Sequence, residues 1–269
     1  MYRRISLLLI LTFLAVILTC PLLYAYDISQ EDNLSSWDIA IQNSLIQDNV
    51  NQAELAVNIE KAKEQKQQSR DAFIKKVISQ ANEAGIVPKS FIEPLSVKST
   101  YTWTNLIGFD SDDGGSGVGW SGSNWNTTWN ANFNGSRAEI AGSYWAEGRG
   151  WVYYTPATSG NYDVFASYYL TGRIIGGNFT TKLLLIDTNT GSEYEQTLYN
   201  TSTSQYFDNV YKSHTKNFYL TAGHTYAITF VTETSASATV SATMSDFYSQ
   251  EFDGTQREIG WYSFSVTPR

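Results

Sequence analysis

Three aspartates stand close together in the chain and are its clearest candidate metal ligands. Asp110, Asp112 and Asp113 lie within four residues, and Gly114 follows them directly. Closely spaced carboxylates around a turn suit the oxygen-rich coordination shell of Ca²⁺. The segment departs from an EF-hand loop, because Ser121 occupies the position of the final glutamate. Since Asp and Gly are also common in solvated turns, the sequence leaves both a calcium loop and a plain turn open.

Tryptophans in polar surroundings are the second chemical feature. Six of the eight tryptophans lie between residues 103 and 151. Among them, Trp120, Trp125 and Trp129 are surrounded by Gly, Ser, Asn and Thr rather than by aliphatic residues. Rings on such loops can stack on sugar faces while asparagine side chains bond the hydroxyls. Large aromatics also plug the ends of β-sandwich cores, so these three candidate ligand-binding residues have a structural alternative.

Side chains that common enzymes need are scarce. The two histidines, His214 and His224, lack metal-ligand spacing, and no Gly-x-Ser-x-Gly elbow is present. The single cysteine, Cys20, lies in an N-terminal apolar segment, so the rest of the chain holds no thiol. Glu139 and Glu147 could act together in a glycosidase only if the fold brought them to one cleft. The sequence therefore gives no catalytic residue, and we expect a protein that is not an enzyme.

The elements that position these residues change from helix to strand along the chain. From residue 101 onward, apolar and polar residues alternate as in half-buried strands, most clearly over residues 162–170. Tyr262, Phe264 and Val266 predict the last strand, with these three side chains on one face. No segment with helical periodicity interrupts the strands. The region therefore predicts an antiparallel β-sandwich or jelly roll.

Two patterns of a turn and a strand recur in this region. In Tyr154–Val164, a turn containing Gly160 is followed after one residue by Tyr162, which opens an apolar strand. In Leu220–Ile228, an Ala-Gly pair is followed after two residues by a Tyr and then an Ile, and its glycine predicts a hairpin turn. These patterns resemble the jelly rolls of carbohydrate-binding modules and similar exported domains, over about the last 120 residues. The resemblance implies a fold more than an activity.

The part of the chain that precedes the strands is expected to be helical. Residues 35–84 contain no Pro or Gly. One apolar stripe at helical spacing runs over residues 39–57, and a second begins at Phe73 after the polar stretch 61–70. The two prolines within residues 86–100 indicate a linker.

Charge is segregated along this helical region. Asp27–Glu60 hold seven acids and no base, whereas Lys61–Lys98 hold eight bases and four acids. Such a pattern suits the pairing of an acidic helix with a basic one, within one chain or between chains. The other interpretation is a helical stalk with solvated faces. We favour the stalk, because the apolar stripe is short for a coiled coil.

The N-terminus carries a membrane-directed segment. Arg3 and Arg4 precede residues 5–25, which hold no charge. This arrangement fits a secretory signal peptide, and the run is also long enough to remain as a membrane anchor. We therefore expect residues 1–25 to be a signal peptide or anchor, residues 26–85 a helical region, residues 86–100 a linker and residues 101–269 the β-sandwich domain. The protein should then be secreted or at the cell surface, held there by residues 5–25 if they are retained.

Charge and composition narrow the choice of partner and function. The net charge of −8 repels phosphate backbones, so no nucleic-acid partner is expected. No cofactor is expected apart from Ca²⁺. The sequence predicts an exported cell-surface module for binding or adhesion, without catalysis, whose partner is a glycan or another surface polymer. The first alternative is a structural protein that self-assembles into a filament or layer through its helical region. The second is a glycan-cleaving enzyme.

Overall fold

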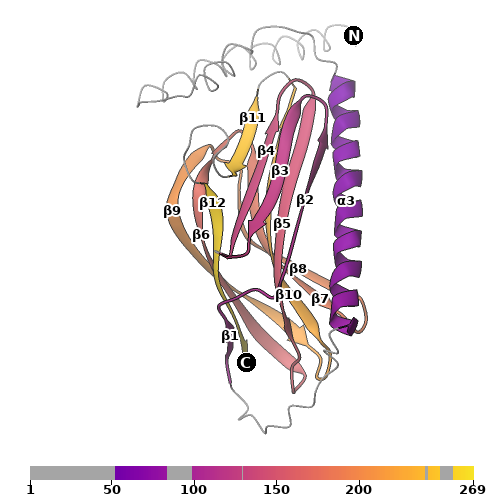
Figure 1. Ribbon diagram of the computed structural model, residues 1–269, viewed down its shortest axis with the longest axis vertical. Coiled ribbons are helices and arrows are strands. Elements are labelled where there is room, and N and C mark those ends of the chain that lie inside the picture. The colour runs from indigo at the N-terminus through magenta and orange to yellow at the C-terminus, as the bar shows by residue number, and fades with distance from the viewer. Residues whose placement is uncertain (1–51, 84–98, 129, 240–241, 249–256) are drawn as a thin grey trace, which may run out of the picture. The chain divides into compact units, whose positions relative to one another are not determined.

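The computed structural model describes residues 52–83, 99–128, 130–239, 242–248 and 257–269. These residues form one helix, α3 (Gln52–Glu83), and twelve strands (Figure 1). In chain order the strands are β1 (Tyr101–Trp103), β2 (Gly108–Ser116), β3 (Gly119–Asn126), β4 (Ala131–Ala138), β5 (Gly142–Tyr154), β6 (Gly160–Ile175), β7 (Asn178–Asp187), β8 (Glu193–Thr201), β9 (Gln205–Leu220), β10 (Tyr226–Ala238), β11 (Thr243–Phe247) and β12 (Glu258–Pro268). The predicted fold class, mainly β with an N-terminal helix, is confirmed.

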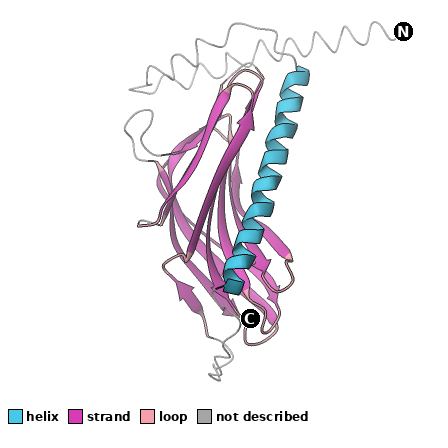
Figure 2. Ribbon diagram, turned by 45° about the vertical axis from the view of Figure 1, so that its right-hand side comes forward, coloured by secondary structure: helices cyan, strands magenta, loops and turns pink. Residues whose placement is uncertain are grey.

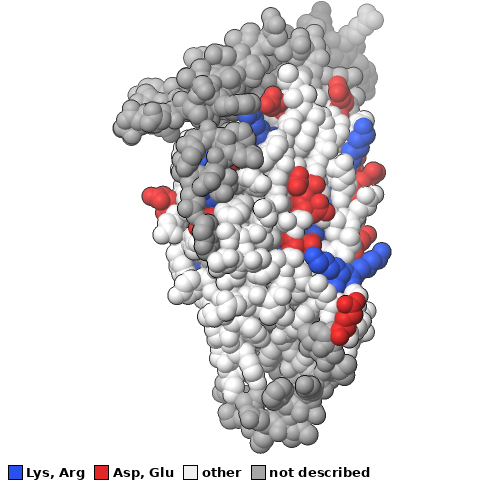
Figure 3. All heavy atoms as spheres, in the orientation of Figure 1, with Lys and Arg blue, Asp and Glu red and all other residues white. Residues whose placement is uncertain are grey.

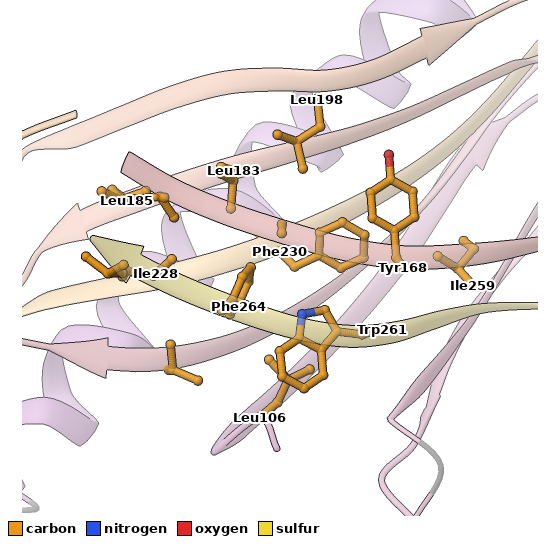
Figure 4. Close-up of a cluster of buried hydrophobic side chains, with 14 of the residues drawn as sticks. Leu106, Tyr168, Leu183, Leu185, Leu198, Ile228, Phe230, Ile259, Trp261 and Phe264 are labelled. Atoms are coloured by element: carbon orange, nitrogen blue, oxygen red, sulfur yellow. The ribbon is translucent and has the colours of Figure 1, made fainter. Parts of the chain in front are cut away.

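The strands pair into two antiparallel sheets. We call the seven-stranded sheet sheet A; its order is β1-β12-β4-β11-β6-β9, with β3 beside β4. Sheet B has five strands in the order β2-β5-β10-β7-β8. The inner faces of the two sheets pack on each other, as Figure 4 shows for Tyr168 and Phe264 from sheet A and Phe230 from sheet B. The rings of Tyr168 and Phe230 lie 4.8 Å apart between centroids. The predicted β-sandwich is therefore confirmed.

Strand β6 follows the predicted alternation closely. Tyr162, Val164, Ala166, Tyr168 and Leu170 are all buried in the core between the sheets. Removing such a row from water contributes roughly 1.5–3 kcal/mol for each large side chain. The period of two in the sequence thus sets which face of β6 points inward.

The prediction of a hairpin around Gly223 is wrong, because the two strands that flank the turn do not pair with each other. The turn itself is present, and Gly223 has the positive φ of 76° that favours glycine. However, β9 before the turn belongs to sheet A, whereas β10 after it belongs to sheet B. The connection therefore crosses from one sheet to the other. Both strands bury their apolar face in the same core, so their alternation alone does not distinguish a hairpin from a crossing.

Helix α3 packs on the outer face of sheet B, which corrects the prediction of a solvated stalk. Figure 2 shows the helix running along the strands of this sheet. Phe73 and Val77 from the helix form a cluster with Trp151, Leu184 and other residues of the sheet. The helix is continuous through the polar stretch 61–70. Apolar periodicity shows that a helix has a buried face, but it does not show what covers that face.

Polar contacts hold the N-terminal part and the middle of the helix. The Asn58 side chain donates to the carbonyl of Ala141 at 2.8 Å, and Ser69 accepts a hydrogen bond from Arg149 at 2.9 Å. Val57, predicted to lie on the apolar stripe, is exposed, because the adjacent Asn58 takes the buried position. Within the described residues, Lys66, Arg70 and Lys76 of the basic half pair with acidic residues of sheet B.

Several predictions concern residues that the structure does not describe. The apolar run 5–25, the apolar stripe before residue 52 and most of the linker 86–100 lie outside the described residues. Within the described part, the helix is too polar to cross a membrane. The signal or anchor segment and the domain boundaries remain predictions.

Candidate functional site

The outer face of sheet A carries a group of exposed tyrosines. Helix α3 covers the outer face of sheet B, where it packs mainly on β2, β5 and β10. On the outer face of sheet A, β9 presents Tyr206, Tyr211 and Tyr219, and β12 presents Tyr262. Their exposed fractions are 71%, 59%, 62% and 66%, respectively. We call this surface, together with Tyr169 of β6, the tyrosine face.

Tyr169 lies across the sheet at the centre of this face. It is directly opposite Tyr211 on one side and Gly260 on the other. A Cβ atom at Gly260 would lie 1.9 Å from Cζ of Tyr169, so only glycine leaves room for the ring there. The Tyr169 hydroxyl donates to Glu258 at 2.8 Å. Burial, this hydrogen bond and the charge of Glu258 raise the pKa of Tyr169 to about 12, so the hydroxyl keeps its proton at neutral pH.

Rows of small hydroxyl side chains lie next to the aromatic row. Ser213, Ser167 and Ser263 are neighbours across β9, β6 and β12, and Ser167 and Ser263 are hydrogen-bonded at 2.8 Å. In the following row, Thr215 and Ser265 flank the partly exposed ring of Phe165. Successive outward-facing rows are about 7 Å apart, twice the rise of one residue in a strand. The face therefore alternates aromatic rings with donor and acceptor hydroxyls.

Several charged groups at this surface are ion-paired. Arg173, directly opposite Tyr206, and Arg257 both pair with Asp246, and all three are buried. Asp163, on the row beyond Thr215, is paired with Arg269 at 2.8 Å, and this guanidinium holds the pKa of Asp163 below its usual value. Glu258 is buried and bonded to Tyr169. In the view of Figure 3, most of the acidic and basic side chains lie toward the helix side. The tyrosine face thus suits a neutral, hydroxyl-rich ligand better than an ionic one.

The predicted tryptophans do not form one binding surface. Trp120 and Trp125 both lie on β3, at positions of opposite parity, so they point to opposite faces of sheet A. Trp125 faces inward, where its ring packs near Phe109 and its indole N–H donates to the carbonyl of Asp110 at 2.8 Å. Trp129 lies outside the described residues.

Trp120 lies on the outer face of sheet A, in a setting like that of Tyr169. A Cβ at Gly122 or Gly135 would lie 2.8 Å or 2.6 Å from its ring, so both glycines make room for it. Tyr248 meets the ring edge to face at 5.3 Å. The use of Trp120 or Trp125 by a ligand stays a prediction.

The three aspartates do not form the predicted turn. Residues 108–116 form strand β2, so Asp113 points to the face opposite Asp110 and Asp112. The carboxylate of Asp110 is already paired with Arg149 at 2.9 Å and with Lys76 at 2.6 Å. Among the described residues, no three acidic, histidine or cysteine side chains are grouped so as to hold a metal. Calcium binding at these positions stays a prediction.

The carboxylates considered for catalysis are ion-paired. Glu139 is bound to Arg137 at 2.8 Å, and Glu147 is bound to Arg149 at 2.6 Å. Glu147 lies opposite Glu233 on the neighbouring strand, and Lys66 contacts both. Burial alone would raise the pKa of Glu233, but the ammonium groups of Lys66 and Lys182 hold it below its usual value. An acid held ionised in this way is unsuited to protonate a leaving group.

The two histidines each contact neighbouring side chains of the fold. His224 follows the turn at Gly223 and shares a hydrogen bond of 2.8 Å with Asp187. The ring of His214 stacks near Tyr168, and burial together with Lys216 and Lys212 lowers the pKa of His214.

Sequence reasoning missed the tyrosine face. Tyr262 was expected to share a face with Phe264 and Val266, but the register shifts between Trp261 and Ser263, and this bulge turns Tyr262 outward. For β9 a signal was present, because Tyr211 and Tyr219 alternate with Val210, Phe218 and other inward positions. Alternation shows that tyrosines can face outward, but it does not show that those of two distant segments share a surface.

Comparison with known proteins gives structural neighbours of low similarity. No family model and no curated protein sequence matches the chain. TmCBM61 in complex with β-1,4-galactotriose is 14% identical, with a TM-score of 0.28, over 60% of this chain and 90% of that one. A family 35 carbohydrate-binding module from Clostridium thermocellum is 10% identical, with a TM-score of 0.22, over 62% and 90%. Eiger TNF from S. frugiperda is 16% identical, with a TM-score of 0.23, over 45% and 64%. Carbohydrate-binding modules, which the sequence resembles, are thus among the solved structures similar to this chain.

Proposed function

We propose that this protein is an exported, non-catalytic module that binds a neutral polysaccharide on its tyrosine face. The observation that carries the proposal is the central row of this face, where Tyr169 lies flat over Gly260 beside the exposed Tyr211. A flat ring on a rigid sheet offers its π face to the apolar face of a sugar ring with little loss of side-chain freedom.

The neighbouring rows supply the polar part of recognition. Serine and threonine hydroxyls can donate to and accept from sugar hydroxyls, and Ser213 and Ser263 stand next to the aromatic row, on either side of the buried Ser167. Tyr211 and Tyr219 are eight residues apart on β9, which corresponds to about 26 Å along a strand. This length favours an extended chain over a single sugar.

Export is the second part of the proposal. It is supported by Arg3, Arg4 and the uncharged run 5–25, which have the order of a secretory signal. An exported module that retains a polysaccharide would act in adhesion to a glycan surface.

Retention on immobilised polysaccharides tests the binding site. The full chain is passed over neutral β-1,4-galactan, mannan and xylan, and over anionic polygalacturonate as a charged counterpart. We expect retention on at least one neutral polymer. Replacing Tyr211 or Tyr262 with Ala should weaken it about two- to tenfold, since a stacked ring contributes about 0.5–1.5 kcal/mol.

Tyr194 provides the matched control. It is a 46% exposed tyrosine on β8 of sheet B, so Tyr194→Ala removes a similar ring from the other sheet. Equal retention of Tyr211→Ala, Tyr262→Ala and the unchanged chain would reject the tyrosine face as the site. Retention only on polygalacturonate would reject the neutral ligand.

A further inference from the structure

A polar groove lies between helix α3 and the edge of sheet B, away from the tyrosine face. Its volume is about 390 Å³, within the range of small-ligand sites. The helix contributes Gln65, Gln68, Ser69 and Ala72, and the sheet contributes Asp112, Asp113, Gly114, Gly115 and Trp145. Two of the three predicted metal ligands, Asp112 and Asp113, therefore line this groove, and of these two Asp112 is the one whose side chain points to the helix-covered face.

Trp145 supplies an unused hydrogen-bond donor to this groove. Its side chain is only 4% exposed, and its indole Nε1 has no hydrogen-bond partner among the described residues. A buried N–H without an acceptor is costly, and in native structures it calls for an explanation such as a bound molecule. Gly114 keeps the approach open, since a Cβ there would lie 3.2 Å from this nitrogen and 2.8 Å from Oε1 of Gln65. A ligand oxygen in the groove would accept this hydrogen bond.

The charge of the groove is negative and is not balanced locally. Under the helix, acids and bases alternate across sheet B in the order Glu193, Arg70, Glu195, Lys182, Glu233, Lys66, Glu147, Arg149, Asp110 and Lys76. Asp112 lies on the same face, opposite Glu147, but takes no part in this network. Among the described residues, its Oδ1 accepts just the backbone N–H of Asp113. The Asp113 carboxylate lies on the opposite face of β2, where it accepts from Ser121. Within the described lining, no side chain carries a positive charge.

We propose that this groove binds an amino sugar with a free, protonated amine. The ammonium group is held by the carboxylate of Asp112. A ring or hydroxyl oxygen accepts from the Trp145 indole, and the amides of Gln65 and Gln68 bond the remaining hydroxyls. A sugar acid is repelled by the Asp112 carboxylate, and a metal ion alone leaves the indole N–H without an acceptor.

This site is independent of the proposed polysaccharide surface. The groove uses the helix-covered face of sheet B, whereas the tyrosine face belongs to sheet A. Loss of binding at either place leaves the other assay unaffected, so failure of one proposal is distinguishable from failure of the other.

The indole N–H signals of the full, ¹⁵N-labelled chain report on the groove directly. The Trp145 signal is identified by its loss in Trp145→Phe, which keeps an aromatic ring and removes only the donor. Glucosamine, glucose and glucuronate are compared because they share a sugar ring and differ in charge. We expect glucosamine to shift the Trp145 signal saturably, glucose to shift it less, and glucuronate to leave it unchanged.

Two variants make the result specific. Asp112→Asn keeps the size and removes the charge, and should weaken glucosamine binding about tenfold. Trp261→Phe removes another buried indole N–H that lacks a partner among the described residues, but one in the core, and should not affect glucosamine binding.

The proposal is overturned if glucosamine leaves the Trp145 signal in place, or if Asp112→Asn binds glucosamine as well as the unchanged chain does. It is also overturned if CaCl₂ alone shifts this signal saturably and glucosamine does not, because the groove would then be a cation site.

Discussion

At the level of single residues, the outer face of sheet A is shaped by glycines that make room for aromatic rings. Gly260 lies under Tyr169, and Gly122 and Gly135 lie under Trp120. A ring that lies flat on a strand needs a neighbour without a Cβ, which explains glycine in the interior of these strands despite its conformational cost. The same geometry keeps the ring parallel to the sheet, where a ligand can reach it.

Gly260→Ala should therefore displace the Tyr169 ring. We expect destabilisation by about 1–3 kcal/mol, the usual cost of an overpacked site, together with weaker retention on neutral polysaccharide. The measurement is urea unfolding. In a double-mutant cycle, most of this cost should disappear when Tyr169→Ala is added, and a fully additive result would show that the ring and Gly260 are not in conflict.

The raised pKa of Tyr169 predicts a dependence on alkaline pH. Between pH 10 and pH 12 this tyrosine keeps its proton in the folded chain, while the unfolded chain loses it. The unfolded state is favoured as the pH rises, so this residue's contribution to stability is complete below pH 10 and is lost through pH 12. Unfolding midpoints measured across this range should fall less steeply in Tyr169→Phe, and identical slopes in the two proteins would contradict the assignment.

At the level of secondary-structure elements, two kinds of contact join helix α3 to sheet B. Apolar side chains pack together at the C-terminal part of the helix, and alternating charges meet along its middle. Phe73 and Val77 pack on Trp151, and Lys66 bridges the opposed carboxylates of Glu147 and Glu233. Acidic residues of the sheet under the helix account for the basic half of the segregated charge, whereas the acids of residues 27–51 lie outside the described residues. That segregation could be read from the chain, but its partner could not, because the sheet residues come from distant segments.

Lys66→Met should destabilise the protein because it leaves two adjacent carboxylates without their shared cation. Breaking a fully buried pair costs about 3–5 kcal/mol, and since the Lys66 side chain is 30% exposed we expect about 2–3 kcal/mol. Lys63→Met is the matched control, because Lys63 pairs with Glu60 in solvent and should change stability by less than about 0.5 kcal/mol. Equal unfolding free energies for the two variants would show that the bridge is not structural.

Acid should loosen the helix before it unfolds the sheets. The pKa values of Glu233 and Glu195 lie below their usual value of 4.5, held there against burial by the cations around them. Folding stability from these groups is therefore present above pH 4.5 and is lost as the pH falls through their lower, folded-state values. Amide hydrogen exchange in residues 52–83 should rise in this range ahead of exchange in β6. If the amides of residues 52–83 and of β6 lost their protection from hydrogen exchange at the same pH, this prediction would be contradicted.

The whole molecule combines parts that the sequence predicts well with parts that it cannot. Period-two alternation identified the antiparallel sandwich and the buried side of β6, because a half-buried strand requires it. The crossing at Gly223, the outward turn of Tyr262 and the docking of the helix escaped prediction. Each of these three features depends on which distant segment packs against it. Local periodicity carries no information on that pairing. The tyrosine face is assembled from three such strands, so it emerged only with the fold.

Hydroxyl-radical footprinting with a retained neutral polysaccharide tests the central claim most directly, because it reports each tyrosine separately in the unchanged chain. The account predicts that oxidation of Tyr211, Tyr219 and Tyr262 slows when the polysaccharide is bound, while oxidation of Tyr194 on sheet B continues at the same rate. If the polysaccharide binds and these three tyrosines are oxidised as fast as before, the tyrosine face is not the binding site.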